Sequence, residues 1–468
     1  MTILDVPGRR RRARRVRRAL VASAAAGAVL GGVLVLAPWE REAAPPPAPG
    51  PAALARSAVT GGAPAALSDL AVLIDEHEAR LRERPRDAAS WAVLGAAYLE
   101  LGRRTADAGQ YPRARRALES ALRHRPRDAR ALEAMASLAV ARRDFPAARK
   151  WAEAARDAAP RRWTAQAVLA EAYTGLGKHE AVAKALERMT ELGSGPAVKA
   201  RAAAVYRDMG WREDAAAQIS DAAAAAATPA QRAAYLEQAG RLALERGDRE
   251  TALRHFQEAL RTDPDLRAAQ AGQGRALAAL GRTSEALAAY RAALAKQPRA
   301  EWALELGELY ESLGLDQAAR VQYGLLRDRV RRAAAAGVDE ELVLGRFEAD
   351  HGDAWAAVRR LRAEWKRQPA TEVADALGWA LYRAGEYEEA LPYAVRATEG
   401  EQGGGVRSAL YAFHRGMVER KLERYGAARR HLQEALRIDP YFSPLGVPEA
   451  RRALDRLGEP SVEDPPVF

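Results

Sequence analysis

The side chains that most often carry chemistry occur in this chain, but they do not fall into reactive patterns. No histidine has the H-E-x-x-H spacing or another metal-binding spacing, and the G-x-S-x-G sequence does not occur. Polar side chains usually lie at the surface of a protein, so we expect the histidines to face solvent. The seven histidines are His77, His124, His179, His255, His351, His414 and His431.

Two further patterns are too weak to predict a reaction. The run Gly175-Leu176-Gly177-Lys178 resembles part of a phosphate-binding loop, but it lacks the G-x-x-x-x-G-K-[ST] spacing. Aspartates and glutamates are scattered among arginines, as is typical of solvated surface pairs. We therefore expect no catalytic residue, no metal, no cofactor and no small-molecule substrate.

The absence of cysteine and the distribution of charge exclude or disfavour further kinds of functional site. The chain has no cysteine, which excludes disulfides, thiolate metal sites and a catalytic cysteine. The formal net charge is +11. Residues 1–18 carry +7 of this charge, and residues 43–468 carry only +5. Nucleic acid is therefore an unlikely partner for the main part of the chain.

The elements that position the side chains repeat about every 34 residues. Pro126 and Pro160 are 34 residues apart, and so are Pro264 and Pro298. A Gly-x-x-x-x-Ala element follows the same rhythm, at Gly210/Ala215, Gly247/Ala252, Gly281/Ala286, Gly314/Ala319, Gly352/Ala357 and Gly385/Ala390. Such a period predicts a solenoid of helix pairs, in which small residues allow close packing and glycine allows a tight turn.

Specific residues give this period a family resemblance. Trp91, Leu94, Gly95 and Tyr98 resemble the first helix of a tetratricopeptide repeat, and Tyr111-x-x-Ala114, Leu118, Ala121 and Pro126 resemble its second helix. An insert at 103–110 lengthens the turn between them. The resemblance covers residues 67–457 and implies an all-α, right-handed solenoid of about ten helix pairs.

We predict ten repeats with a capping helix at each end. The caps are Leu67–Leu81 and Pro448–Leu457, and longer loops are expected at 329–338 and 399–406. The fourth repeat is rich in alanine. The repeats are predicted to begin near Ala88, Ala129, Trp163, Pro196, Ala233, Arg267, Ala300, Val338, Thr371 and Ala409.

The family resemblance also suggests where a partner binds. In such proteins the first helices line a concave groove, and a protein or peptide ligand lies there. The ninth positions of repeats one to three are Ala96, Ser137 and Glu171, which do not match the family's clamp for a terminal carboxylate. A set of large side chains occupies groove positions in repeats nine and ten: Trp379, Tyr382, Phe413 and Met417.

Two alternatives apply to each groove feature. The large side chains could be exposed anchors for a partner, or they could pack internally. Similarly, acidic residues in repeats seven and eight could make the middle of the groove acidic, or they could belong to a solvated face. These acidic residues are Glu301, Glu308, Glu311, Asp339 and Asp350.

The N-terminal residues have the pattern of a membrane anchor. Residues 19–37 are uncharged, span about 28 Å as a helix and follow eight arginines. This predicts a basic cytoplasmic tail (1–18), a transmembrane anchor or uncleaved signal (19–37) and an extracytoplasmic solenoid. A cleaved signal peptide with secretion, or an ordinary buried helix, is the alternative. Residues 38–66 are predicted to be a Pro/Ala-rich linker, and 458–468 a disordered tail.

These features favour a binding function over an enzymatic one. We expect a membrane-anchored, extracytoplasmic scaffold for protein–protein interaction. One alternative is an envelope assembly chaperone for unfolded clients, and another is a non-catalytic subunit of an envelope polymer synthase. A regulator that uses the arginine-rich tail on nucleic acid is a further alternative.

Overall fold

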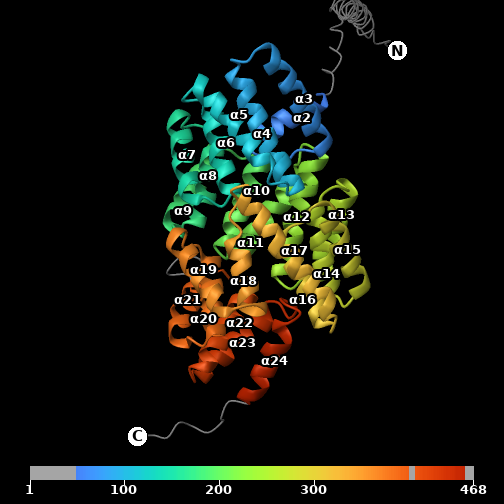
Figure 1. The fold of residues 1–468 in the computed structure, drawn as a ribbon, viewed down its shortest axis with the longest axis vertical. Helices are drawn as coiled ribbons and strands as arrows, with labels where there is room; N and C mark the ends of the chain where they lie inside the picture. The colour runs from blue at the N-terminus through green and yellow to red at the C-terminus, as the bar shows by residue number, and fades with distance from the viewer. Residues whose placement is uncertain (1–48, 400–405, 459–468) are drawn as a thin grey trace, which may run out of the picture. The chain divides into compact units, whose positions relative to one another are not determined.

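Helices account for all regular secondary structure in residues 49–399 and 406–458, the part of the chain that the computed structural model describes (Figure 1). The helices are α2 (Pro51–Thr60), α3 (Leu67–Glu83), α4 (Ala88–Thr105), α5 (Gln110–His124), α6 (Ala129–Ala141), α7 (Phe145–Ala158), α8 (Trp163–Gly175), α9 (His179–Leu192), α10 (Pro196–Asp208), α11 (Arg212–Ala224), α12 (Pro229–Glu245), α13 (Arg249–Thr262), α14 (Arg267–Ala279), α15 (Thr283–Lys296), α16 (Ala300–Ser312), α17 (Asp316–Ala335), α18 (Glu341–His351), α19 (Ala354–Arg367), α20 (Thr371–Ala384), α21 (Tyr387–Thr398), α22 (Ala409–Lys421), α23 (Tyr425–Ile438) and α24 (Gly446–Leu457).

Ten antiparallel pairs, from α4/α5 to α22/α23, form the predicted repeats. Eight of them begin at the predicted residue. The fifth begins at Pro229 instead of Ala233, because the Thr228 hydroxyl caps the helix and Pro229 suits its first turn. The eighth begins at Glu341 instead of Val338. Helix α3 packs on α4 at one end of the array, and α24 packs on α22 and α23 at the other.

Small residues allow the two helices of a pair to approach closely. All six alanines of the Gly-x-x-x-x-Ala element are fully buried or nearly so. At Gly95 a β-carbon would lie 2.5 Å from the Leu118 side chain, so the first repeat requires glycine there. Gly210 and Gly385 adopt positive φ angles of 78° and 91° where the first helix turns into the second. The sequence period thus marks the points of closest packing.

The solenoid coils far enough for one superhelical turn to rest on the next, and helices α7–α9 lie above α19–α21 in the view of Figure 1. The Arg142 guanidinium donates to the Gly337 carbonyl at 2.7 Å, and the Asp339 amide donates to the Arg142 carbonyl at 3.1 Å. Gln297 donates to the Arg103 carbonyl at 3.2 Å. These partners are 194–197 residues apart, so the chain returns to itself after between five and six repeats.

The contact between turns uses two of the irregular segments. Arg329 donates to the Ala106 carbonyl at 3.0 Å, which joins segment 329–338 to the insert at 103–110. The predicted loop at 329–338 is wrong for most of its length, because α17 continues to Ala335. Ala333 and Val338 are buried against the first repeats, and this apolar contact stabilises the extra helical turns. The other predicted loop, at 399–406, lies almost wholly outside the described residues.

The predicted linker is also partly helical. Helix α2 occupies residues 51–60, where Pro51 starts the helix and Gly61 and Gly62 end it. Its buried face, Ala55 and Ala58, packs on α3 and α4. An alanine-rich stretch therefore becomes helical once a partner surface buries it.

The predicted tail 1–18, the anchor 19–37 and nearly all of the tail 458–468 lie outside the described residues. Within 49–399 and 406–458, no helix combines the length and the apolar character that crossing a bilayer requires.

Candidate functional site

A cavity of about 710 Å³ lies inside the coil and is lined by residues from repeats two to ten. Most of the lining side chains come from the first helices of the repeats, including Glu171 of α8, Arg241 of α12 and Arg346 of α18. The inner face predicted from the family resemblance is therefore the face that forms the cavity. Its volume falls within the range of ordinary ligand sites.

A smaller cavity of about 190 Å³ lies over the first three repeats. Ala96 and Ser137, two of the predicted groove positions, line it. The residues that follow α2 close one side, and Arg162 donates to the Thr60 carbonyl at 3.5 Å. The N-terminal segment thus covers part of the groove in the early repeats.

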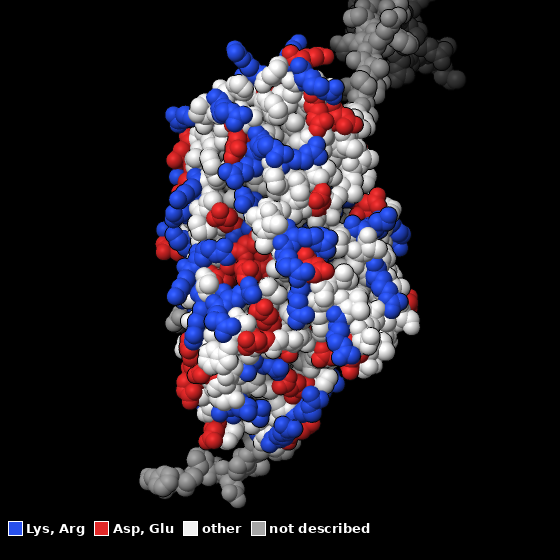
Figure 2. Space-filling model, viewed as in Figure 1, with Lys and Arg blue, Asp and Glu red and all other residues white. Residues whose placement is uncertain are grey.

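Arginines outnumber carboxylates in the lining of the large cavity. The arginines are Arg201, Arg207, Arg212, Arg241, Arg249, Arg275, Arg346 and Arg407. The carboxylates are Glu171, Asp208, Glu245, Glu305, Glu372 and Asp439. The described lining therefore has an excess of positive charge. On the side of the molecule shown in Figure 2, charges of both signs are interspersed.

Several lining arginines are neutralised by partners one repeat away. Arg201 forms an ion pair with Glu171, and Arg275 forms one with Glu305. The Tyr290 hydroxyl also donates to Glu305, at 2.9 Å. Burial lowers the pKa of Arg201 to about 10, so its guanidinium is still charged at neutral pH. These pairs connect successive first helices along the wall of the cavity.

A second polar group lies where repeats two, four, eight, nine and ten meet. Glu372 of α20 accepts from Arg143 at 2.5 Å, and Arg207 pairs with Asp208 at 2.7 Å. Burial alone would raise the pKa of Glu372, but the charges of Arg143 and Arg346 outweigh it and lower that pKa. Burial raises the pKa of Tyr411 well above its ordinary value. At neutral pH the group therefore presents an ionised carboxylate and a neutral phenol.

The four predicted groove residues lie together but are not exposed. Trp379, Tyr382, Phe413 and Met417 have exposures of 5%, 8%, 2% and 1%, inside the core of the last repeats. Trp379 stacks on Tyr382, and its indole nitrogen donates to Asp350 at 2.9 Å. Of the two alternatives for these side chains, this burial favours internal packing, because Phe442 and the last helices cover them.

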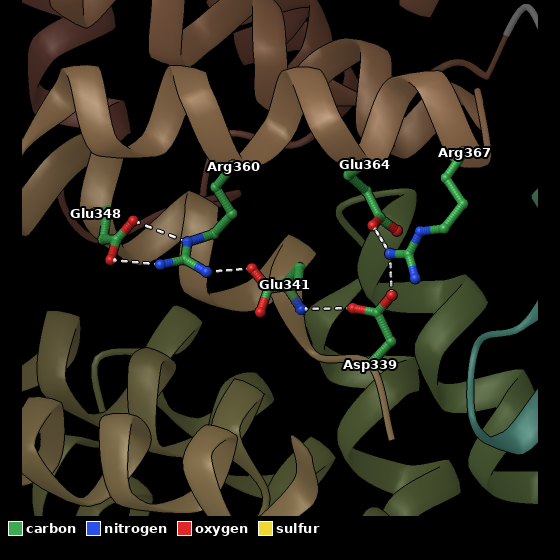
Figure 3. A network of polar contacts seen from close by, with 6 residues as sticks. All are labelled: Asp339, Glu341, Glu348, Arg360, Glu364 and Arg367. Atoms are coloured by element: carbon green, nitrogen blue, oxygen red, sulfur yellow. Dashed lines mark hydrogen bonds and ion pairs between the residues drawn. The ribbon is translucent and has the colours of Figure 1, made fainter. Parts of the chain in front are cut away.

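The predicted acidic residues are mostly paired with cations. Arg367 bridges Asp339 and Glu364, and Arg360 bridges Glu341 and Glu348, the latter at 3.0 Å (Figure 3). Glu364 is almost fully buried, although carboxylates were expected to be solvated. Its burial is possible because Arg367 and Gln368 both bond to it.

Glu308, Glu311 and Asp350 are paired as well. His351 approaches Glu308 at 3.6 Å and Glu311 at 3.2 Å, and Arg383 approaches Asp350 at 3.5 Å. Burial would lower the pKa of His351, but Glu308 and Glu311 outweigh it and raise the pKa. The middle of the groove is therefore less acidic than a count of its carboxylates indicates.

The prediction that the histidines face solvent is wrong for His77 and His414. Both side chains are buried, and His414 contacts Asp375 at 2.8 Å while stacking on Trp379. The hydrogen bond offsets the loss of water around the imidazole of His414. Neither ring nitrogen of His77 has a hydrogen-bond partner among the described residues. No cluster of three His, Cys, Asp or Glu side chains suited to a metal ion occurs in residues 49–399 and 406–458.

Family comparison agrees with this geometry. A family model described as tetratricopeptide repeat matches residues 99–160, 237–298, 271–334 and 376–441. Each matched segment contains helix pairs with the packing described above. Tetratricopeptide repeats therefore occupy these segments of the chain. Among curated proteins, no sequence matches it significantly.

Solved structures similar to this repeat protein are distant from it in sequence. The human IFIT1 dimer with PPP-AAAA is 17% identical, with 71% of this chain and 78% of that chain covered and a TM-score of 0.45. The Cut9–Hcn1 hetero-tetramer of the APC/C is 15% identical, with 78% and 76% covered and a TM-score of 0.39. A repeat protein from Thermus thermophilus is 23% identical, with 42% and 99% covered and a TM-score of 0.33.

The cavity arginines of this repeat protein were missed by the sequence prediction, although the sequence contains a signal for three of them. Arg207, Arg241 and Arg275 recur at intervals of 34 residues, in step with the repeat. Equivalent positions in a solenoid lie along the same face, so this spacing could have predicted an arginine row on the groove. Arg346 and Tyr411 lie outside that row, and no sequence signal indicates them.

Proposed function

We propose that this repeat protein is a non-catalytic scaffold that binds a segment of another protein in its central cavity. The observation that carries the proposal is the convergence of nine repeats on one concave surface. Repeat proteins use such concave inner surfaces for binding.

The character of the lining supports a peptide as the ligand. Val205, Met209 and Phe442 offer apolar contacts, while guanidiniums of the first helices offer hydrogen-bond donors. A peptide has both kinds of group, since its carbonyls accept hydrogen bonds and its side chains include apolar ones. Five of the six lining carboxylates, all except Asp439, form ion pairs with arginines and are therefore not arranged for proton transfer.

We further propose that residues 19–37 anchor the protein in a membrane with the repeats outside the cytoplasm. The support is the uncharged stretch of 19 residues that follows eight arginines. Protease treatment of intact spheroplasts tests this topology. The repeats should be digested without lysis, and their protection until lysis would contradict the proposal.

Photo-crosslinking in cells tests the binding function of the full chain. A photoreactive phenylalanine analogue replaces Tyr411, which lines the cavity, or Tyr425, which is exposed elsewhere in the same repeat. We expect Tyr411 to capture a defined protein, and Tyr425 to give much less of it. The two positions carry the same native side chain, so the comparison isolates the cavity.

The identity of the captured protein separates the alternatives. One dominant product supports a scaffold, while a ladder of unrelated proteins would indicate a chaperone instead. Capture at Tyr425 alone, or at neither position, would contradict binding in the cavity.

A further inference from the structure

Two arginines of the cavity, Arg212 and Arg346, form no ion pair within the described residues. Arg212 donates instead to the Glu245 carbonyl at 3.2 Å. Arg346 of α18 has neither a hydrogen bond nor an ion pair in 49–399 and 406–458, and its buried Nε atom has no partner. Most of the other lining arginines have carboxylate partners, as Arg201 and Arg275 show. Burying a guanidinium without an anion is unfavourable, so this position is suited to an anion from outside the chain.

A second donor lies close to Arg346. Tyr411 of α22 lines the same cavity, and its hydroxyl has no hydrogen bond within the described residues. The two residues are near enough for the charge of Arg346 to influence the phenol. A guanidinium and a phenol can together hold a carboxylate, since both donate to its oxygens.

The neighbouring charges leave Arg346 available. Glu372 accepts from Arg143, and Asp208 accepts from Arg207 at 2.7 Å. Asp375, the charge with the largest influence on the pKa of Tyr411, contacts His414 at 2.8 Å. Glu372 also feels the charge of Arg346. Each of these three carboxylates has a side-chain partner of its own, whereas Arg346 forms no ion pair in the described part of the chain. An entering anion therefore meets one free guanidinium rather than a uniformly basic wall.

We propose that Arg346 and Tyr411 bind a side-chain carboxylate of an acidic partner segment. The inference rests on the proposed protein-binding function and specifies the chemistry of the ligand. The site joins α18 and α22, which belong to repeats eight and ten rather than to one repeat. The site therefore does not consist of the same position in successive repeats.

The lining favours an acidic peptide over a nucleic acid. Carboxylates such as Glu171, Glu245 and Glu305 alternate with the arginines around the wall. A nucleic-acid backbone carries a negative charge at every phosphate and would approach these carboxylates repeatedly. A peptide can place one acidic side chain at Arg346 and neutral residues elsewhere.

Fluorescence anisotropy with the full-length protein in detergent tests the site. The probes are labelled peptides of alternating glutamate and alanine, matched peptides of glutamine and alanine, and a short oligouridylate. Variants are Arg346→Gln, Arg346→Lys and Tyr411→Phe. The control is Arg320→Gln, which removes the same charge from an exposed position on α17. The basic tail is identical in all variants, so its contribution cancels.

We expect Arg346→Gln to weaken binding of the glutamate peptide roughly tenfold to a hundredfold, as loss of a hydrogen bond to a charged group predicts. Tyr411→Phe should weaken binding by a smaller factor, and Arg346→Lys should retain part of the affinity. Arg320→Gln should change it by less than about twofold. Thermal unfolding of each variant checks that the fold is intact.

Three results would overturn the proposal: no binding of the glutamate peptide to the native chain, equal effects of Arg346→Gln and Arg320→Gln, or a loss of oligouridylate binding in Arg346→Gln at least as large as its loss of glutamate-peptide binding. If Tyr411 still captures a protein in cells while the glutamate peptide gives one of these results, the scaffold function stands and only the acidic ligand is excluded. If Tyr411 captures nothing, the scaffold function itself fails.

Discussion

Substitution of Gly177 by alanine probes the contact between superhelical turns. Gly177 lies in the turn after α8, and α20 of the next superhelical turn follows Pro369. A β-carbon on Gly177 would lie 2.3 Å from the Pro369 carbonyl oxygen. Gly177 also has a positive φ of 62°, which disfavours alanine whatever its neighbours.

Gly281 separates these two effects, because it has a positive φ of 74° but no atom near its virtual β-carbon. Alanine at Gly281 should therefore destabilise the protein by about 1–2 kcal/mol through backbone strain alone. Alanine at Gly177 adds a collision with rigid backbone, which typically costs a further 1–3 kcal/mol or so. Gly247, where the nearest atom is 3.1 Å away, should fall between them.

The assay combines thermal unfolding with hydrogen exchange. We expect the unfolding midpoint to fall in the order Gly281→Ala, Gly247→Ala, Gly177→Ala, with Gly177→Ala lowest. Backbone amides around Pro369 should exchange faster in Gly177→Ala and remain protected in Gly281→Ala, because only the first substitution separates the turns. Equal midpoints for Gly177→Ala and Gly281→Ala, with unchanged exchange near Pro369, would show that the turns do not pack together.

Three further substitutions test the charges and core that hold the coil. Burial, and secondly Glu301, raise the pKa of Glu340 to about 7 from a reference of 4.5. The folded protein is therefore most stable below the reference pKa, where Glu340 is protonated. It loses up to about 3 kcal/mol of its free energy of unfolding as the pH rises through about 7. Glu340→Gln should flatten this pH dependence in denaturation curves. Arg104→Met should lower the free energy of unfolding by about 3 kcal/mol, because it leaves the mostly buried Asp263 without its ion-pair partner at 2.7 Å. A double variant that also replaces Asp263 by asparagine should recover part of the loss. An additive loss in the double variant would contradict the coupling of the two residues. Trp379→Ala should lower the free energy of unfolding by about 3–5 kcal/mol, because Trp379 is part of the core. An unchanged midpoint in urea denaturation would contradict its internal packing.

The repeat architecture could be predicted from the sequence because its causes are local. Glycine at a turn such as Gly385 and alanine at a close approach such as Ala390 act within one helix pair. The first-helix position of Glu171 also followed from the period, and it does line the cavity. Each of these features depends on neighbours within about one repeat.

The irregular segments show where prediction failed. The sequence marks 103–110 and 329–338 as departures from the repeat, and both were expected to be loops. In the structure they meet, through Arg329 and the Ala106 carbonyl, more than 220 residues apart in sequence. A contact of that separation depends on the summed rotation of the intervening repeats, which no local pattern contains.

The residues of the candidate site could likewise be predicted only in part. The large apolar residues of repeats nine and ten occupy groove positions by their spacing, yet Trp379 and Phe413 are buried, because they pack on each other and Phe442 packs on Phe413. Arg346 and Tyr411, by contrast, are inconspicuous in the sequence and line the cavity only because α18 and α22 converge there.

The sequence alone therefore determined that the chain is a helical repeat array, how many repeats it has and nearly where each begins. These properties arise from side chains that pack within one repeat or on its neighbour. The tertiary structure decided that the coil closes on itself, that it encloses a cavity and which charged groups remain unpaired inside. Those outcomes depend on small rotations accumulated over five to six repeats, and on contacts that form only when the coil is complete.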